Sequence, residues 1–328
     1  MTQSASQDVF RHLVGRLKIR HLSLLLQIQK LGSLTRVAEH MATSQPAMTQ
    51  ALAELEDMFG TRLFERSPRG MVATRQGEAV LMRARTILND LDLLTLDMDA
   101  VSQGRIAHLH IGAIPLVSGM KVAQAIQRTT SHEAGLSVTV QGGVTHQLLQ
   151  MLRDHSLDLV LARVSDTLDM RDLSYDVLHR QSPRLIASRL TAGRLGRRRL
   201  DWSQLLDMDW VLGHRNTPVR KQIADIFLSE GLPPPSPTVE SHSSHLIGDI
   251  IATNDKAISI VPADIAEDLV RATGVAIVPY SFEWALSPVA LFARATEQQR
   301  PINIAFGTAL REVFSPDVSS ARQGTYSY

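Results

Sequence analysis

The sequence predicts an all-α winged helix-turn-helix at the N-terminus, a long linker helix, and a C-terminal α/β domain of two lobes. Three observations support this. Short helices with apolar faces flank a tight turn near residue 43, residues 74–101 carry apolar side chains at alternating spacings of four and three, and the remainder alternates between strand and helix patterns. A chain of 328 residues is also too long for one typical core.

The composition is that of a folded chain without disulfides. Charged residues make up 20% and apolar residues 44%, which is close to the average for globular domains, and there is no cysteine. A disulfide, a thiolate nucleophile and a cysteine-bound zinc ion are therefore excluded. The N-terminal residues lack the apolar core and cleavage site of a secretory signal, and no stretch reads as a membrane span. We therefore expect a cytoplasmic protein with no membrane partner.

Helical spacing and capping residues predict the first three helices. Leucine and isoleucine recur at helical spacing over residues 19–32, and the helix stops at Gly32. Ser33 is placed to cap the second helix. Ser44 is placed to cap a third, in which Pro46 occupies the first turn, where its missing N–H is tolerated. Two short helices joined by a tight turn form a helix-turn-helix.

The third helix has an apolar and a polar face. Met48, Leu52 and Leu55 form the apolar stripe, which leaves Gln45 and Gln50 on the other face. An ordinary amphipathic helix would show the same pattern. Glutamine, however, can make paired hydrogen bonds to adenine in the major groove of DNA. The pattern is therefore also that of a recognition helix.

After the third helix, two short strands around a Pro/Gly turn predict a hairpin, or wing. Arg66 and Arg69 would project from its tip. Such arginines are usually solvated, but beside a helix-turn-helix we interpret them as contacts to phosphate or to the minor groove. Residues 1–73 carry nine Lys or Arg against six acidic residues, a mild bias that gains meaning only in this context.

Residues 74–102 predict a linker helix with a coiled-coil seam. The seam consists of Val80, Ala84, Ile87, Leu91, Leu94, Met98 and Val101. We interpret it as a dimerisation surface, because the helix joins two otherwise independent modules. The alternative is an amphipathic helix that packs on its own domain.

From residue 105 onward, two runs of alternating strands and helices predict two lobes with parallel, doubly wound sheets around a shared cleft. Residues 188–199 are strongly basic and polar. We interpret them as a surface loop rather than as a second nucleic-acid site.

Loops at the carboxyl ends of parallel strands are where open α/β sheets bind ligands. Here these loops end in Ser, Thr or Gly at helix starts, whose amides and hydroxyls would suit a small anion. The expected effector contacts are Ser118, Thr145, His146, Arg163, Thr217, Ser243 and Ser244. The alternative is a structural role, in which these residues only cap their helices and Arg163 holds the hinge between the lobes.

Two other classes of function remain as alternatives: an enzyme fused to a helix-turn-helix, and an architectural DNA-binding protein without a ligand. His242, His245 and Asp249 have a conceivable metal-ligand spacing, but a helix cap explains this segment more simply. No nucleophile elbow, P-loop or dinucleotide turn appears, so no catalytic residue, metal or cofactor is expected. A large α/β region would be superfluous for bending DNA.

The segment LGSLTRVAEHMATSQPAMTQALAELEDMFGTRLFERSPRGMVATRQGE resembles the LysR-type transcriptional regulators. The SQPA opening, the LE end of the third helix, the LF.R strand and the T..G start of the linker occur in the order and spacing of that family. The resemblance is strong over residues 19–100 and rests on the strand pattern beyond them. The front end also resembles the branch of galactose-binding-protein and protocatechuate-pathway regulators.

This resemblance implies a winged helix-turn-helix, a linker-helix dimer, a periplasmic-binding-protein-like effector domain and, usually, a tetramer. The expected DNA contacts are Arg36, Ser44, Gln45, Pro46, Ala47, Thr49, Gln50, Arg66 and Arg69. Many members carry arginine at the position of Gln50, so a preference for guanine would be replaced here by one for adenine.

The expected function is sequence-specific transcriptional regulation. Its partners would be double-stranded DNA with an interrupted palindrome, a small effector (a carboxylate or other anion) and further copies of the chain, with RNA polymerase as a candidate partner. The expected domains are an extension (1–18), the DNA-binding domain (19–73), the dimerisation helix (74–102), the effector domain (105–315) and a tail (316–328).

Overall fold

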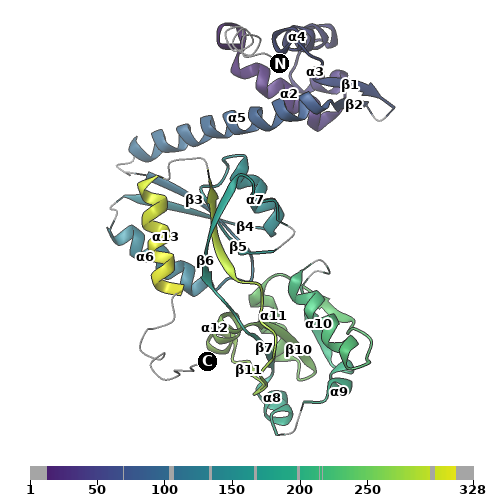
Figure 1. Ribbon diagram of the computed structural model, residues 1–328, viewed down its shortest axis with the longest axis vertical. Coiled ribbons are helices and arrows are strands. Elements are labelled where there is room, and N and C mark those ends of the chain that lie inside the picture. The colour runs from purple at the N-terminus through teal and green to yellow at the C-terminus, as the bar shows by residue number, and fades with distance from the viewer. Residues whose placement is uncertain are drawn as a thin grey trace, which may run out of the picture. The chain divides into compact units, whose positions relative to one another are not determined.

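The computed structural model describes residues 13–68, 70–102, 107–132, 135–165, 168–197, 200–213, 215, 217–295 and 300–314. The chain divides into two compact units, Met1–Asp99 with Arg153–Ser156, and Ala100–Leu152 with Leu157–Tyr328 (Figure 1). Most of the expected extension, Arg69 and the expected tail lie outside the described residues. No helix in the described ranges is both long enough and apolar enough to cross a bilayer.

The first unit contains the expected helix-turn-helix, hairpin and long helix. Its elements are α2 (Ile19–Leu31), α3 (Leu34–His40), α4 (Gln45–Phe59), β1 (Phe64–Ser67), β2 (Gly70–Ala73) and α5 (Arg75–Ser102). Gly32 ends α2 in the left-handed conformation, which glycine adopts without steric cost. The Ser44 side chain caps α4 by accepting from the amide of Ala47, whereas Ser33 occupies the cap position of α3 without a side-chain bond.

The wing is fastened to the helix-turn-helix by its backbone. The amide of Met71 donates to the carbonyl oxygen of Gly32 at 2.8 Å. Gly70 has a φ of +107°, and a Cβ there would overlap the same Gly32 oxygen, so only glycine fits. On the other strand, Glu56 Oε1 accepts from the amides of Leu63 and Phe64 at 2.8 and 3.2 Å. These contacts hold the hairpin at a defined position beside α3 and α4.

The core of the first unit includes only the first part of α5. Leu81 packs with buried residues of α2, α4 and the wing, and Ala84 is also buried. The later residues of the expected seam are exposed, with Leu94 at 54%, Met98 at 65% and Val101 at 67%. Packing on its own domain therefore accounts for the start of α5, while the later part of its apolar row is exposed among the residues that the structure describes.

The first lobe of the second unit is built on a five-stranded sheet. In spatial order its strands are β4 (Leu136–Gly142), β3 (Ala107–Ala113), β5 (Leu159–Arg163), β12 (Val289–Arg294) and β6 (Leu173–His179). Its helices are α6 (Gly119–His132), α7 (Thr145–Arg153) and α13 (Pro301–Phe314). The expected parallel pairing holds for β4, β3 and β5, while β12 pairs antiparallel with both β5 and β6.

The second lobe has its own five-stranded sheet. In spatial order its strands are β11 (Ala276–Ile277), β7 (Pro183–Ala187), β10 (Ala257–Pro262), β8 (Asp209–Leu212) and β9 (Pro237–Glu240). Its helices are α8 (Arg189–Leu195), α9 (Trp202–Leu206), α10 (Pro218–Ser229), α11 (Ser244–Thr253) and α12 (Ala263–Thr273). Strand β7 runs antiparallel to both of its neighbours.

Two predictions for the second unit were wrong. The sheets are mixed rather than purely parallel, because β12 returns from the second lobe to the first and β7 enters the second lobe directly from β6. The segment 188–199 is not simply a surface loop, since it contains α8. Ser188 caps this helix by accepting from the amide of Thr191, and Thr191 and Ala192 are buried, so one face of the segment belongs to the core.

Candidate functional site

Helix α4 presents the polar face that its sequence predicts. Leu52 and Leu55 are buried, whereas Gln45, Thr49 and Gln50 are exposed. The side-chain amide of Gln45 donates to Thr49 Oγ1 at 2.9 Å. Ser44, Pro46 and Ala47 are likewise exposed at the start of the helix. This face therefore offers several hydrogen-bonding groups.

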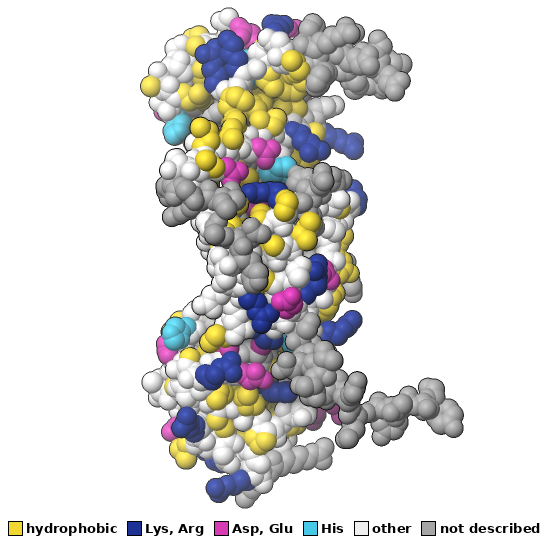
Figure 2. Space-filling view, turned by 90° about the vertical axis from the view of Figure 1, so that its left-hand side faces the viewer, with side chains coloured by type: hydrophobic (Ala, Val, Ile, Leu, Met, Phe, Trp, Pro, Cys, Tyr) yellow, Lys and Arg dark blue, Asp and Glu magenta, His cyan; other side chains and the backbone are white. Residues whose placement is uncertain are grey.

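A groove of about 520 Å³ lies between the start of α3 and the wing. It brings together three of the expected DNA contacts from three separate elements, namely Arg36, Gln45 and Arg66. On the face shown in Figure 2, Lys and Arg side chains lie in small separate groups interspersed with acidic ones. The described residues form no broad basic surface on that face.

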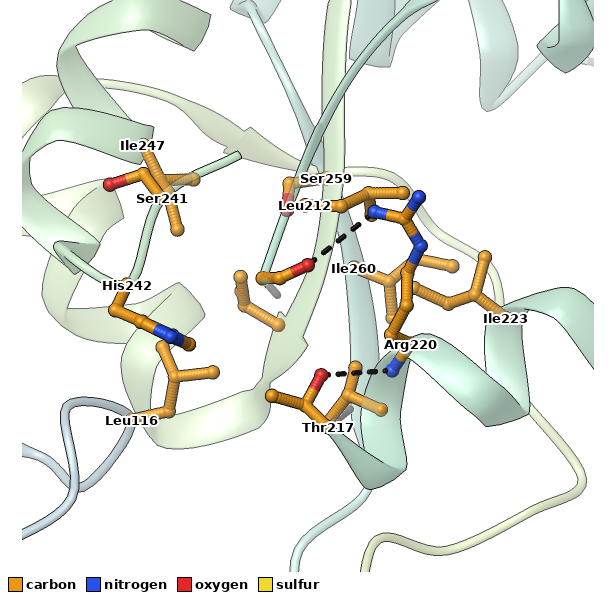
Figure 3. Close-up of a pocket in the computed structure, with 13 residues that line it drawn as sticks. Leu116, Leu212, Thr217, Arg220, Ile223, Ser241, His242, Ile247, Ser259 and Ile260 are labelled. Atoms are coloured by element: carbon orange, nitrogen blue, oxygen red, sulfur yellow. Dashed lines mark hydrogen bonds between the residues drawn. The ribbon is translucent and has the colours of Figure 1, made fainter. Parts of the chain in front are cut away.

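A second candidate site is a small pocket in the two-lobed unit (Figure 3). Its volume is about 30 Å³, and its lining residues come from Leu116 of the first lobe and from β8, α10, β10, α11 and nearby loops of the second. The lining is mainly aliphatic, with polar groups from Thr217, Arg220, Ser241 and His242. A pocket of this size holds only water-sized molecules.

Arg220 is the cation of this pocket. Its guanidinium lies 3.8 Å from Glu240 Oε1 and donates to the carbonyl oxygen of Gly213 at 3.4 Å. Its amide donates to Thr217 Oγ1, which thereby caps α10. Burial lowers the pKa of Arg220, and Glu240 opposes the shift. Both contacts to the described residues are long, so these residues neutralise the charge only loosely.

Arg163 connects the two chain segments that pass between the lobes. Its guanidinium donates to the carbonyl oxygen of Ser287 and to Oε1 of Gln181, both at 2.6 Å. These residues lie on the segments that link β12 and β6 to the second lobe. The side chain is buried, and burial lowers its pKa to about 10. These contacts favour the hinge role over an effector contact as the prediction for Arg163.

Ser118 is also committed to internal contacts. It is 1% exposed, its hydroxyl donates to Asp268 Oδ2 at 2.6 Å, and its oxygen accepts from the amide of Lys121 at 3.3 Å. Asp268 lies on α12 of the second lobe, and its carboxylate also pairs with Arg271. The hydroxyl therefore bridges the lobes in this structure.

A buried carboxyl group lies close to this bridge. Asp264, near the start of α12, is 6% exposed; its Oδ1 accepts from the amide of Ile265 at 2.9 Å. Burial raises its pKa, while Lys121 and Arg163 act in the opposite direction. His179 shows the complementary effect, because burial and then Lys121 lower its pKa.

Among the expected effector contacts, Thr217 lines the pocket and the others do not. Thr145 is half-buried and His146 exposed at the start of α7, while Ser243 caps α11 through the amide of Leu246 and Ser244 begins that helix. Sequence reasoning missed Arg220, although its place three residues after a cap residue puts it on the first turn of α10. No group of three His, Asp or Glu side chains in the described ranges is placed to hold a metal ion.

Comparisons with known proteins match both units. Residues 19–78 match the bacterial regulatory helix-turn-helix protein, lysR family, and residues 102–315 match the LysR substrate binding domain. The chain is 27% identical over 299 residues to the HTH-type transcriptional regulator GbpR of Azospirillum brasilense, covering 91% of this chain and 86% of that protein. It is 27% identical over 310 residues to PcaQ of Agrobacterium fabrum, covering 90% and 95%.

Solved structures show the same fold. The crystal structure of CbnR, a LysR family transcriptional regulator, aligns with a TM-score of 0.61 at 19% identity, covering 92% of this chain and 100% of that one. Full-length CbnR complexed with its target DNA aligns with the same TM-score, covering 90% of this chain and 100% of that one.

Proposed function

The chain belongs to the LysR family of transcriptional regulators, and on that premise we propose that a small organic anion, bound in the cleft of the two-lobed domain, controls its binding to DNA. The chain is a DNA-binding regulator with a substrate-binding domain, and not an enzyme. The proposal adds the charge of the effector and the residues that contact it.

The observation that carries this proposal is Arg220 in the wall of the pocket. Its guanidinium is partly buried, and its contacts to Glu240 and Gly213, which lie in the described part of the chain, are long. A carboxylate or similar anion would give it a shorter, charge-assisted bond. Thr217 would add its hydroxyl, while Thr145, His146, Ser243 and Ser244 would be reached by a ligand that widens the pocket between the lobes.

Ser118 and Arg163 are proposed for a different part of this response. Both hold the lobes together through internal hydrogen bonds. A ligand that binds one closure angle better than another shifts the population toward that angle. These two residues would therefore set the resting arrangement of the lobes, on which the effector acts.

At the other end of the chain, the N-terminus of α4 would enter the major groove, and Arg36, Arg66 and Arg69 would contact the backbone. Two copies joined along α5 would read an interrupted palindrome. Pairing through the effector domains would give a tetramer, and RNA polymerase is a candidate further partner. The expected DNA contacts at Ser44, Pro46, Ala47 and Thr49 lie on the same exposed helix start.

Thermal-shift measurements on the full chain test the effector proposal. The panel consists of small carboxylates, sugar acids, phenols and sulfonates, and an anion that binds the folded state raises the melting temperature. Arg220→Gln should abolish that rise. Arg215→Gln is the matched control, because Arg215 is the same distance from Glu240 but its side chain is 85% exposed. Stabilisation of wild type and Arg220→Gln by the same compound to the same extent would overturn the proposal.

The DNA part is tested by comparing Gln45→Ala with Arg66→Ala. Loss of a base contact should cost about 1–3 kcal/mol and relax the preference at one base pair. Loss of a phosphate contact should weaken all sequences alike and reduce the salt slope by about one. If Gln45→Ala weakened binding to specific and random DNA equally, Gln45 would be assigned to the DNA backbone rather than to a base.

A further inference from the structure

Two glutamine side chains on the exposed face of α4 are each hydrogen-bonded to a residue one turn later. The amide nitrogen of Gln45 donates to Thr49 Oγ1 at 2.9 Å, and that of Gln50 donates to Glu54 Oε1 at 3.1 Å. All four side chains are exposed. Burial does not fix these side chains, so the two amides are held by hydrogen bonds to residues of the same helix.

The chemistry of the partners fixes which way each amide faces. An ionised carboxylate can only accept, so the end of Gln50 that faces Glu54 must be the NH₂ group. The hydroxyl of Thr49 donates to the backbone carbonyl oxygen of Gln45 at 3.1 Å. Its hydroxyl oxygen can therefore only accept a hydrogen bond from the side-chain amide of Gln45. In both pairs the side-chain carbonyl oxygen of the glutamine therefore points away from the residue that accepts its NH₂ group.

The direction of the second pair matters for base recognition. Glu54 lies one turn toward the C-terminus of α4, and a recognition helix contacts base edges mainly through its N-terminal residues. The hydrogen bond to Glu54 therefore orients the NH₂ group of Gln50 toward the C-terminus of α4. The side-chain carbonyl oxygen of Gln50 is left facing the major groove of the DNA. A free glutamine side chain could present either end.

We propose that Glu54 is a positioning residue that holds Gln50 with its side-chain carbonyl oxygen toward DNA, so that on the strand it faces Gln50 accepts a hydrogen bond from the exocyclic amine of adenine or cytosine rather than contacting guanine or thymine. Adenine and cytosine expose an amine in the major groove, whereas guanine and thymine expose only acceptors for hydrogen bonds there. An oxygen facing guanine or thymine would lie against another acceptor. This inference rests on the proposed function, in which α4 reads the major groove.

The competing explanation is local helix stability. Polar pairs four residues apart stabilise a helix by a few tenths of a kcal/mol without any role in recognition. Removing Glu54 also removes a negative charge near DNA, which would strengthen binding to every sequence. The test must therefore measure base preference at one position rather than affinity alone.

Selection from a randomised duplex library, followed by sequencing, provides this measurement with the full chain. The position read by Gln50 is identified as the one that loses its preference in Gln50→Ala. Wild type should prefer one base pair there, and removal of the exocyclic amine from the adenine or cytosine of that pair should weaken binding by wild type at least threefold and leave binding by Gln50→Ala unchanged. Glu54→Ala should reduce the preference for that base pair at least threefold, while the position that changes in Gln45→Ala keeps its preference.

Glu54→Asp is the matched control. Aspartate is still an acceptor-only side chain that pairs with glutamine four residues away, so this variant should retain most of the wild-type preference. The inference is overturned if Glu54→Ala leaves the Gln50 position unchanged, or if removal of that exocyclic amine leaves binding by wild type unchanged. A Gln50→Ala variant that binds DNA with no altered position would instead refute the reading of bases by Gln50, and this inference with it.

Discussion

The hydroxyl of Ser118 donates a 2.6 Å hydrogen bond to the carboxylate of Asp268, which joins the start of α6 in one lobe to α12 in the other. The two residues are 150 positions apart in sequence. Ser118 also caps α6, so one buried side chain both begins a helix and bridges the lobes. The angle between the lobes is thus stabilised by a bond to an ionised group, which is stronger than one between neutral groups.

Ser118→Ala should lower the free energy of unfolding by about 1–3 kcal/mol, because it leaves a partly buried carboxylate without one of its donors. Chemical denaturation of the full chain measures the loss. Ser131→Ala is the matched control on the same helix, since its exposed hydroxyl only donates to the carbonyl oxygen of Gln127. Equal stabilities for the two variants would show that the bond to Asp268 contributes nothing.

Asp264→Asn should become more stabilising as the pH rises from 4 to 7. The pKa of Asp264 is raised by burial, so the folded chain binds this proton more tightly than the unfolded chain. The stabilisation from the protonated carboxyl is present below its ordinary pKa of about 3.9 and is lost as the pH rises through the raised value. Asparagine keeps the oxygen that accepts from Ile265 and does not ionise.

Urea titrations of wild type and Asp264→Asn at several pH values check this prediction. The difference in free energy of unfolding should be small near pH 4 and should favour the variant near neutrality. A difference that does not change with pH would contradict the raised pKa. Asp225→Asn, at an exposed position on α10 of the second lobe, controls for the loss of a carboxylate elsewhere.

The Leu91→Asp, Leu94→Asp double variant should be monomeric and should lose binding to palindromic DNA. These leucines belong to the exposed row of α5, where a partner helix would bury them and leave the new charges unpaired. Sedimentation measures the oligomeric state, and DNA binding is measured in parallel. Thr95→Asp places a charge beside the row and should remain dimeric. A double variant that is dimeric and binds DNA would exclude α5 as the interface.

Gly70→Ala should destabilise the first unit more than Gly60→Ala does. Both glycines have positive φ angles, which cost other residues about 1–2 kcal/mol. A Cβ on Gly60 meets no atom, whereas one on Gly70 overlaps the carbonyl oxygen of Gly32. Thermal melts of the two variants compare the costs, and Gly70→Ala should also weaken DNA binding by displacing the wing. Equal melting temperatures for the two variants would show that the wing accommodates the added Cβ of Gly70→Ala without loss of stability.

The sequence by itself determined the elements whose signals are consecutive residues. The apolar stripe of α4, the Gly32 stop, the cap at Ser44 and the alternating spacings of α5 are all local patterns, since each depends on side chains within a few turns of one another. The same reasoning predicted the alternation of strands and helices from residue 105 onward. It also placed Gln45, Thr49 and Gln50 on the exposed face of α4.

Only the tertiary structure decided which distant residues meet. Strand β12 returns from the second lobe to pair with β5, and Arg163 bonds to residues 18 and 124 positions away. Ser118 turned inward to Asp268, and Arg220 rather than Ser243 or Ser244 joined Thr217 in the pocket. Local periodicity specifies which face of an element is apolar, but not the partner on which that face packs. Partners far apart in the chain are selected by packing and by the need of each buried polar group for a hydrogen bond.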